Sequence, residues 1–173
     1  LVPADFSSAA FFIVAACLAA RDGLLIENVG INPTRTGLLT ILREMGARIE
    51  LRNERSLGAE PVADLWIEQS RLRGIVVRPE LVPLAIDEFP ILFIAAAAAE
   101  GETIVSGADE LRKKETDRIA VMARALQALG VEVEERPDGA RIVGGRIGGG
   151  AVDSRGDHRI AMSFAVASLR AAA

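Results

Sequence analysis

Two long apolar segments, at positions 9–20 and 89–99, constrain the fold of this chain more than any other feature. Each is apolar on nearly every side of a helix, and neither reaches the roughly 20 residues that a membrane-spanning helix needs. Such a helix is stable only when other elements cover it all round. The two segments therefore predict buried helices inside a larger packing of helices and sheets.

A similar order of elements follows both apolar segments. The first is followed by predicted strands at 24–29, 48–52 and 64–68, the second by strands at 103–105, 131–135 and 140–143. An amphipathic helix lies within each set, and Gly46 and Gly130 stand where these two helices should end. Gly23 and Gly101 lie 78 positions apart, and Gly46 and Gly130 lie 84 apart, so the chain repeats with a period near 80.

The repeat predicts an α/β (α+β) domain of βαβαββ units, with parallel helices buried inside a ring of sheets. We expect units at about 1–72, 73–146 and 147–173, the third incomplete. A strand at 75–78 should open the second unit. Because the chain starts without methionine and stops inside an apolar helical pattern, we expect it to be part of one domain of a longer polypeptide.

Polar residues precede each predicted core helix. Ser7 and Ser8 are expected to cap the first, Asp87 to cap the second with Pro90 in its first turn, and Thr34 or Thr36 to begin the amphipathic helix of the first unit. These assignments follow from side-chain chemistry alone.

Composition and charge exclude several classes of function. The net charge of −4 gives no overall basic character for binding nucleic acid, and no apolar segment is long enough to cross a membrane. The one cysteine, Cys17, lies in an apolar helix and reads as a packing residue in a cytoplasmic protein. His158 is the one histidine, so no metal cluster is expected around it.

Three predicted helix starts carry a high density of charge: residues 87–88, 114–118 and 157–159. Acids are favoured there by the helix dipole, whereas bases are disfavoured. A cation becomes favourable when an anion lies between it and the free backbone N–H groups. Lys114, Arg118 and Arg159 therefore indicate one anionic ligand, provided that parallel helices bring their starts together.

Ordinary local roles also account for these residues. Lys114 and Asp117, or Glu115 and Arg118, are spaced to pair on a solvated helix face, and spacing alone favours that interpretation. For Asp87, spacing alone favours an ordinary helix cap. The glycine-rich segment 144–150 lacks the Lys-Ser/Thr of a phosphate loop and is interpreted as a flexible connection.

The segment 111–118, LRKKETDR, resembles the Lys-Glu-Ser/Thr-Asp-Arg motif of the 5-enolpyruvylshikimate-3-phosphate synthase family. Segments 2–12, 86–90 and 156–162 resemble three further signatures of this family, in the same order. Ala4 and Phe89 depart from the usual glycine and leucine. The resemblance covers the whole chain and implies the carboxy-terminal domain of a two-domain enzyme.

The resemblance also implies a reaction, the transfer of the enolpyruvyl group of phosphoenolpyruvate to the 5-hydroxyl of shikimate 3-phosphate. It implies that Asp87 and Glu115 carry protons, that Asp87 and Lys114 bind shikimate 3-phosphate, and that Arg118 and Arg159 bind phosphoenolpyruvate. His158 would give polar support. No metal or cofactor is implied, and the remaining site residues would come from the amino-terminal domain of the same polypeptide.

Two other functions compete with this interpretation. A transferase acting on UDP-N-acetylglucosamine shares the repeat architecture, although its signatures match residues 114–118 less well. The second is a non-catalytic anion-binding or interaction domain that keeps the helix-end cations for folding or regulation.

Overall fold

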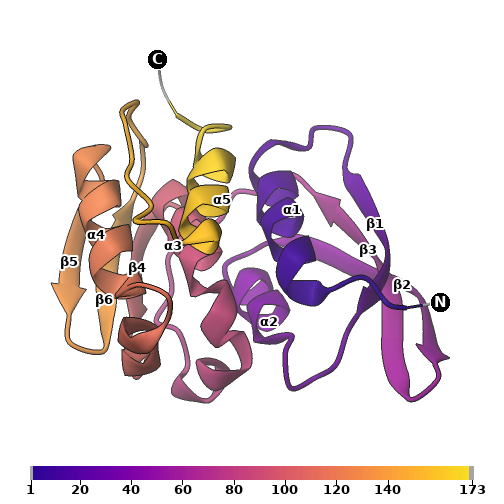
Figure 1. Ribbon diagram of the computed structural model, residues 1–173. Helices are drawn as coiled ribbons and strands as arrows, with labels where there is room; N and C mark the ends of the chain where they lie inside the picture. The colour runs from indigo at the N-terminus through magenta and orange to yellow at the C-terminus, as the bar shows by residue number, and fades with distance from the viewer. Residues whose placement is uncertain (1, 172–173) are drawn as a thin grey trace.

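The computed structural model describes residues 2–171 and contains helices, short 3-10 helices and strands in a repeated order (Figure 1). The first set comprises α1 (Phe6–Ala19), β1 (Leu24–Gly30), α2 (Gly37–Glu44), β2 (Arg48–Leu57) and β3 (Glu60–Glu68). The second comprises η1 (Pro79–Leu81), η2 (Pro83–Glu88), α3 (Phe89–Ala98), β4 (Gly101–Val105), η3 (Asp109–Lys113), α4 (Arg118–Ala128), β5 (Glu132–Arg136) and β6 (Gly139–Gly144). Helix α5 (His158–Ala167) follows.

The strands form two small antiparallel sheets, with orders β1–β3–β2 and β4–β6–β5. In each sheet the last strand of the unit lies in the middle, paired with both others. Figure 1 shows the two sheets on opposite sides of the helices. The fold is therefore a mixed α/β domain in which the same sheet is built twice.

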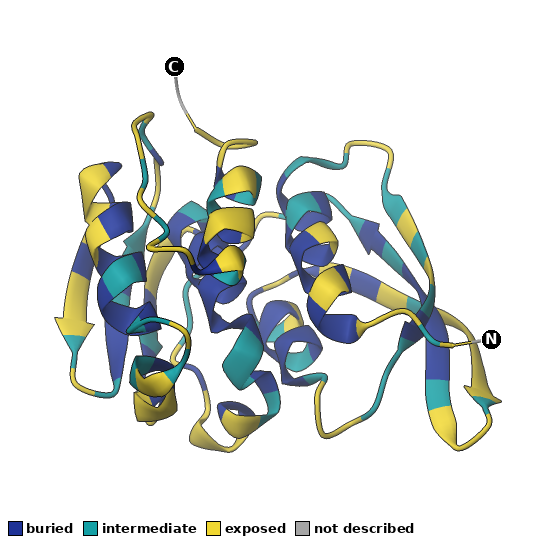
Figure 2. Cartoon of the chain, in the orientation of Figure 1, coloured by how far each residue is buried: buried dark blue, intermediate teal, exposed yellow. Residues whose placement is uncertain are grey.

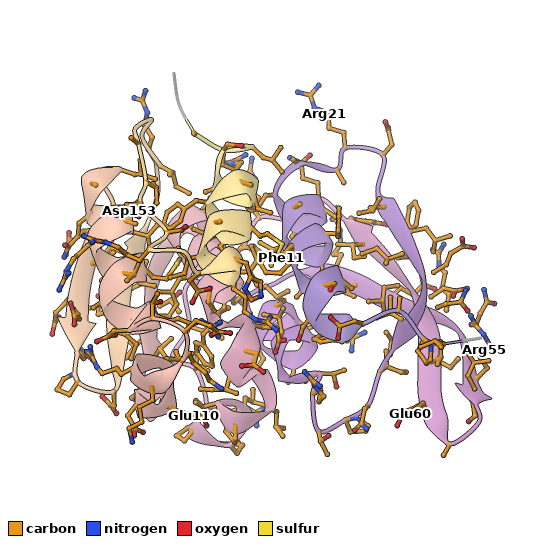
Figure 3. All side chains as sticks on the ribbon, viewed as in Figure 1. Phe11, Arg21, Arg55, Glu60, Glu110 and Asp153 are labelled. Atoms are coloured by element: carbon orange, nitrogen blue, oxygen red, sulfur yellow. The ribbon has the colours of Figure 1, made fainter. Side chains whose placement is uncertain are left out.

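Helices α1, α3 and α5 contact one another between the two sheets. Nearly all of α3 is buried, as expected for a helix without a polar face (Figure 2). The three helices are parallel, because contacts among Ser7, Glu88 and Arg159 join their starts and Leu18, Ala98 and Arg170 line one pocket at their ends. In Figure 3, Arg21 after α1 and Glu110 before α4 lie at opposite ends of the molecule.

The two amphipathic helices end in the same way, as the sequence predicts. Gly46 after α2 has φ 98° and Gly130 after α4 has φ 81°, a left-handed conformation that glycine adopts without strain. In both, the glycine N–H donates three residues back and the next N–H donates five residues back, to Leu42 and to Leu126. This pair of bonds is the Schellman motif.

The helix caps differ from the prediction at two of the core helices. Asp5, and not Ser7 or Ser8, caps α1, since its carboxylate accepts from the backbone N–H of Ser8 at 2.8 Å. Asp87 does not cap α3, because η2 continues into that helix and moves its start to Phe89. The prediction that Thr36 precedes α2 is confirmed, although its side chain makes no capping bond.

The predicted strand at 75–78 is wrong. This segment forms only one isolated parallel bridge to β4, between Val76 and Ile104. Ala4 makes the equivalent bridge to Val29 in β1. The first strand of the expected βαβαββ order is thus reduced to a bridge in both units. In the second unit Pro79 and the 3-10 turns that follow end the extended backbone, and in the first unit α1 begins directly after the bridge.

The glycine-rich connection after β6 is hydrogen-bonded to α3 and to the end of α4. The backbone N–H of Gly145 donates to Ala97 at 2.9 Å and that of Gly148 to Leu129 at 2.8 Å. Cys17 is buried in α1, and burial raises the pKa of its thiol to about 12, which agrees with a packing role. Within residues 2–171, no helix is long and apolar enough to cross a membrane.

Candidate functional site

The charged residues at three helix starts meet around Asp87, the next-to-last residue of η2. Lys114 follows η3, Arg118 begins α4 and Arg159 lies in the first turn of α5. Each of these cations contacts Asp87 through its carboxylate or its carbonyl oxygen. The parallel packing of the helices therefore brings together residues that are up to 72 positions apart.

Lys114 forms two ion pairs in this cluster. Its Nζ lies 3.2 Å from Oδ1 of Asp87 and 2.6 Å from Oε1 of Glu110. The Glu110 hydrogen bond contributes most to raising the pKa of Lys114, with Asp87 adding to it. The ammonium is therefore held in its charged form beside the Asp87 carboxylate.

Arg118 is the most deeply buried of the three cations, with a side chain only 2% exposed. Its Nε donates to Oδ2 of Asp157 at 2.8 Å, and its Nη2 lies 2.5 Å from Oε2 of Glu115. Its Nη1 lies 3.8 Å from Oδ1 of Asp87. Three carboxylates from three segments thus surround one guanidinium.

Asp157 links Arg118 to α5. Its Oδ2 accepts from Arg118, while its Oδ1 accepts from the backbone N–H of Arg159 at 2.9 Å and caps the helix. Burial would raise the pKa of Asp157, but the Arg118 hydrogen bond and charge outweigh it and lower the pKa. This carboxylate fixes the relative positions of α4 and α5.

Arg159 approaches Asp87 from the third helix. Its Nη1 donates to the Asp87 carbonyl oxygen at 3.3 Å and lies 4.0 Å from Oε1 of Glu88. The structure therefore brings Arg118 and Arg159 to the same residue from different helices, as the shared-anion argument requires.

The electrostatic balance at Asp87 favours its carboxylate form. Burial acts to raise its pKa, but the hydrogen bond and charge of Lys114 and the charges of Arg159 and Arg118 lower the pKa overall. Its side chain is one third exposed. An ionised and accessible carboxylate among three cations is equipped to accept a proton from a bound hydroxyl.

Local pairing explains only part of this arrangement. Glu115 and Arg118 do form the i,i+3 pair that spacing predicts, but on a buried guanidinium and not on a solvated face. Lys114 does not pair with Asp117, which instead caps α4 through the N–H of Ala120 and accepts from Arg112.

The remaining candidate, His158, begins α5. Its side chain is exposed and stands outside the hydrogen bonds and ion pairs formed by residues 2–171. Within the same described range, no group of three or more His, Cys, Asp or Glu side chains is arranged to hold a metal ion.

The sequence did not predict the contacts of several polar residues near the site. Glu88 is 5% exposed and accepts a hydrogen bond from the Ser7 hydroxyl, and Arg35 donates to that hydroxyl at 3.4 Å. Asp157 was noted only as part of a charged helix start. The adjacency of Glu88 to Asp87 was the one available signal, since its burial depends on α1 packing against η2.

Comparison with known proteins agrees with the motifs. The family model described as EPSP synthase (3-phosphoshikimate 1-carboxyvinyltransferase) matches residues 1–173. The 3-phosphoshikimate 1-carboxyvinyltransferases of Halorhodospira halophila and Acidithiobacillus ferrooxidans are 64% and 61% identical over 99% and 97% of the chain. The match covers 39% of each relative, so the chain spans about two fifths of their length.

Solved structures show the same likeness in three dimensions. The EPSP synthase of Acinetobacter baumannii superposes with a TM-score of 0.94 at 51% identity, over 99% of this chain and 40% of that one. The enolpyruvyl transferase NikO of Streptomyces tendae has a TM-score of 0.70 at 20% identity, over 98% of this chain and 37% of that one, and shows the fold alone. On the full-length family match and the ordered motifs, the chain belongs to the EPSP synthase family.

Proposed function

We propose that the protein containing this chain transfers the enolpyruvyl group of phosphoenolpyruvate to the 5-hydroxyl of shikimate 3-phosphate, and that this chain supplies one side of the site. The observation that carries the proposal is the meeting of Lys114, Arg118 and Arg159 around Asp87. Both substrates are anions with phosphate groups, and three cations beside one ionised carboxylate suit them. The reaction belongs to aromatic amino-acid biosynthesis.

The reaction has an addition step and an elimination step. In the addition, the 5-hydroxyl loses its proton, its oxygen bonds to C2 of phosphoenolpyruvate and C3 gains a proton. In the elimination, C3 loses a proton, the double bond forms again and phosphate leaves. One group must therefore accept the hydroxyl proton and another must exchange a proton with carbon.

In this scheme Asp87 accepts the hydroxyl proton and Glu115 is the second proton-carrying carboxylate. The cations that lower the pKa of Asp87 keep it ionised, as a proton acceptor must be, and they also make it a weaker base than a free carboxylate. Lys114, held protonated at 3.2 Å from Asp87, is placed to contact shikimate 3-phosphate at the same hydroxyl.

Arg118 and Arg159 bind phosphoenolpyruvate in the proposal, since a planar guanidinium matches carboxylate and phosphate oxygens. The two side chains differ in how accessible they are to a ligand. Arg159 is 18% exposed and directly accessible, whereas Arg118 is 2% exposed and turns Nη1 toward Asp87. His158, exposed at the start of α5, gives polar support at the edge of the site.

The proposal places the other half of the site on a second domain of the same polypeptide, which closes over the substrates. It also divides the present domain into βαβαββ units at about 1–72, 73–146 and 147–173. An apolar groove of about 390 Å³ between α1 and α5, with Phe12 62% and Met162 41% exposed, supports an incomplete third unit. A third sheet would cover this face as the other two sheets cover theirs.

No organic cofactor or metal is required by this chemistry, and the partners are the two small substrates. We infer a cytoplasmic protein, because its single cysteine cannot form a disulfide within the chain. A transferase for UDP-N-acetylglucosamine is less well supported, because the relatives at about 60% identity carry the shikimate activity in their names.

An assay of the parent protein for phosphate release tests the proposal. Release should require phosphoenolpyruvate and shikimate 3-phosphate together, and replacing shikimate 3-phosphate by UDP-N-acetylglucosamine should abolish it. Phosphate release with the nucleotide sugar and not with shikimate 3-phosphate would refute the proposal and favour the UDP-N-acetylglucosamine transferase. Anion binding without release of phosphate would leave the non-catalytic function.

A further inference from the structure

Glu88 is a buried carboxylate that the proposed reaction does not use. It ends η2 beside Asp87 and is 5% exposed. Transfer of a carboxylate out of water is unfavourable unless hydrogen bonds or opposite charges compensate it. A buried carboxylate at this position therefore needs hydrogen-bond donors or a cation beside it.

A capping role does not account for Glu88. It stands directly before α3, but its side chain makes no hydrogen bond to the first turn of that helix. The carboxylate turns instead toward the starts of the other two core helices. There it accepts from the Ser7 hydroxyl of α1 and lies 4.0 Å from Nη1 of Arg159 in α5.

The two contacts of Arg159 are complementary. Its Nη1 donates to the carbonyl oxygen of Asp87 and faces the carboxylate of the adjacent Glu88. The Ser7 hydroxyl donates to the same carboxylate, and Arg35 donates to that hydroxyl. The guanidinium is thus bounded by one backbone acceptor and one fixed negative charge, on consecutive residues.

We propose that Glu88 is a positioning residue, which fixes the guanidinium of Arg159 so that its remaining N–H groups face an anion beside Asp87. This inference rests on the proposed function for the identity of that anion, phosphoenolpyruvate. Glu88 itself touches neither substrate. Burial raises the pKa of Glu88, and the hydrogen bond from Ser7, followed by the charge of Arg159, opposes that rise.

The competing explanation is that Glu88 has a purely structural role, in which its hydrogen bond with Ser7 joins α1 to η2. Two variants of the parent protein separate the explanations. Glu88→Gln keeps an acceptor for the Ser7 hydroxyl and removes the charge that faces Arg159. Ser7→Ala removes the hydroxyl and leaves the Glu88 carboxylate beside Arg159.

Steady-state kinetics give the first readout. For Glu88→Gln we expect the KM for phosphoenolpyruvate to rise roughly five- to tenfold, as when one charge-assisted contact is lost, with kcat and the KM for shikimate 3-phosphate within about twofold. For Ser7→Ala we expect a lower melting temperature and both KM values within about twofold of wild type. Equal changes in the KM for phosphoenolpyruvate in both variants would overturn the proposal and favour the purely structural role.

Binding of inorganic phosphate gives a readout that does not need turnover. Removal of a negative charge near an anion site should by itself tighten binding, whereas loss of positioning should weaken it. Calorimetric titration of the parent should therefore show weaker phosphate binding for Glu88→Gln than for wild type. Unchanged or tighter binding would overturn the role of Glu88. A parent that binds phosphate normally but releases none from the substrates would instead refute the proposed function alone.

Discussion

The two described units have the same sheet order but differ in where they use buried charge. In the first unit, both outer strands bulge, between Ile26 and Val29 in β1 and between Arg52 and Arg55 in β2. The second sheet has a continuous register in both of its pairs. One unit therefore distorts its sheet, while the other keeps its sheet regular.

A single aspartate accompanies the distortion of the first sheet. Asp64 in β3 accepts from the backbone N–H of Asn28 at 2.9 Å and from the side-chain amide of Asn53 at 2.8 Å. Both asparagines have positive φ, at 58° and 50°. The Asn28 and Asn53 bonds, followed by that of Arg55, lower the pKa of Asp64 to about 2.

The second unit places its buried charge at helix starts. Arg118 in α4 and Asp157 before α5 form an ion pair between units, and Asp87 collects cations from three segments. The first unit's carboxylate thus serves its own sheet, whereas those of the second unit reach its neighbours. The repeated packing thus provides the frame, and the residues that differ at the helix starts form the site.

Complete loss of turnover in the isolated chain is the largest effect expected. The chain should fold on its continuous core, yet holding two reactants together is worth roughly 7–11 kcal/mol of barrier, and much of that requires the opposite domain. Purified chain, free of host enzyme, is assayed for phosphate release. Turnover by the chain alone would show that its helix starts suffice and would contradict the two-domain site.

Substitution Asp87→Asn in the parent should lower kcat roughly 10²- to 10⁴-fold, since the amide cannot accept the hydroxyl proton. The melting temperature should change little, because Asp87 caps no helix. The control is Glu102→Gln, which alters an exposed pair with Arg141 in the regular sheet. Unchanged kcat with a lower melting temperature would make Asp87 structural.

Substitution Asp157→Ala should lower the unfolding free energy by about 3–5 kcal/mol, because it leaves the buried Arg118 guanidinium without its closest buried partner. Urea denaturation of the chain measures the change. As a control in the first unit, Arg48→Ala removes an exposed pair with Glu68 and should alter stability by about 1 kcal/mol or less. Similar losses in both variants would erase the difference between the units.

Asp64→Asn should reduce the acid sensitivity of the first unit, the smallest effect expected here. The folded pKa of about 2 lies below the unfolded value of about 3.9, so the ionised carboxylate stabilises the fold above pH 4. This contribution disappears as the pH falls from about 4 toward 2. Unfolding free energies across that interval should therefore fall less steeply in the variant than in wild type. Identical slopes would show that Asp64 does not couple the bulges to pH.

Local sequence signals predicted those parts of the fold that depend on neighbouring residues. Gly46 and Gly130 end their helices as expected, because a left-handed residue after a helix is a local requirement. The strand at 75–78 failed, since extended residues became a bridge where proline and 3-10 turns follow. Asp87 failed as a cap for a related reason, because η2 runs directly into α3.

The sequence predicted which residues belong to the candidate site better than it predicted their contacts. The motifs identified Asp87, Lys114, Arg118 and Arg159, and the structure places all four together. The near-complete burial of Arg118 could not be read from its spacing to Glu115, which suggested a solvated helix face. Burial depends on which elements cover a side chain, and those elements are distant in sequence.

The sequence by itself determined the repeat, the apolar core helices and the concentration of cations at helix starts, since each depends on composition and periodicity within a short segment. Tertiary structure alone decided that Asp157 pairs with Arg118 and that Glu88 lies between Ser7 and Arg159. Partners 39 and 81 positions apart meet only after parallel helices have packed. That packing sets the distance between two charges. No local sequence pattern encodes this distance, so the sequence could not predict it.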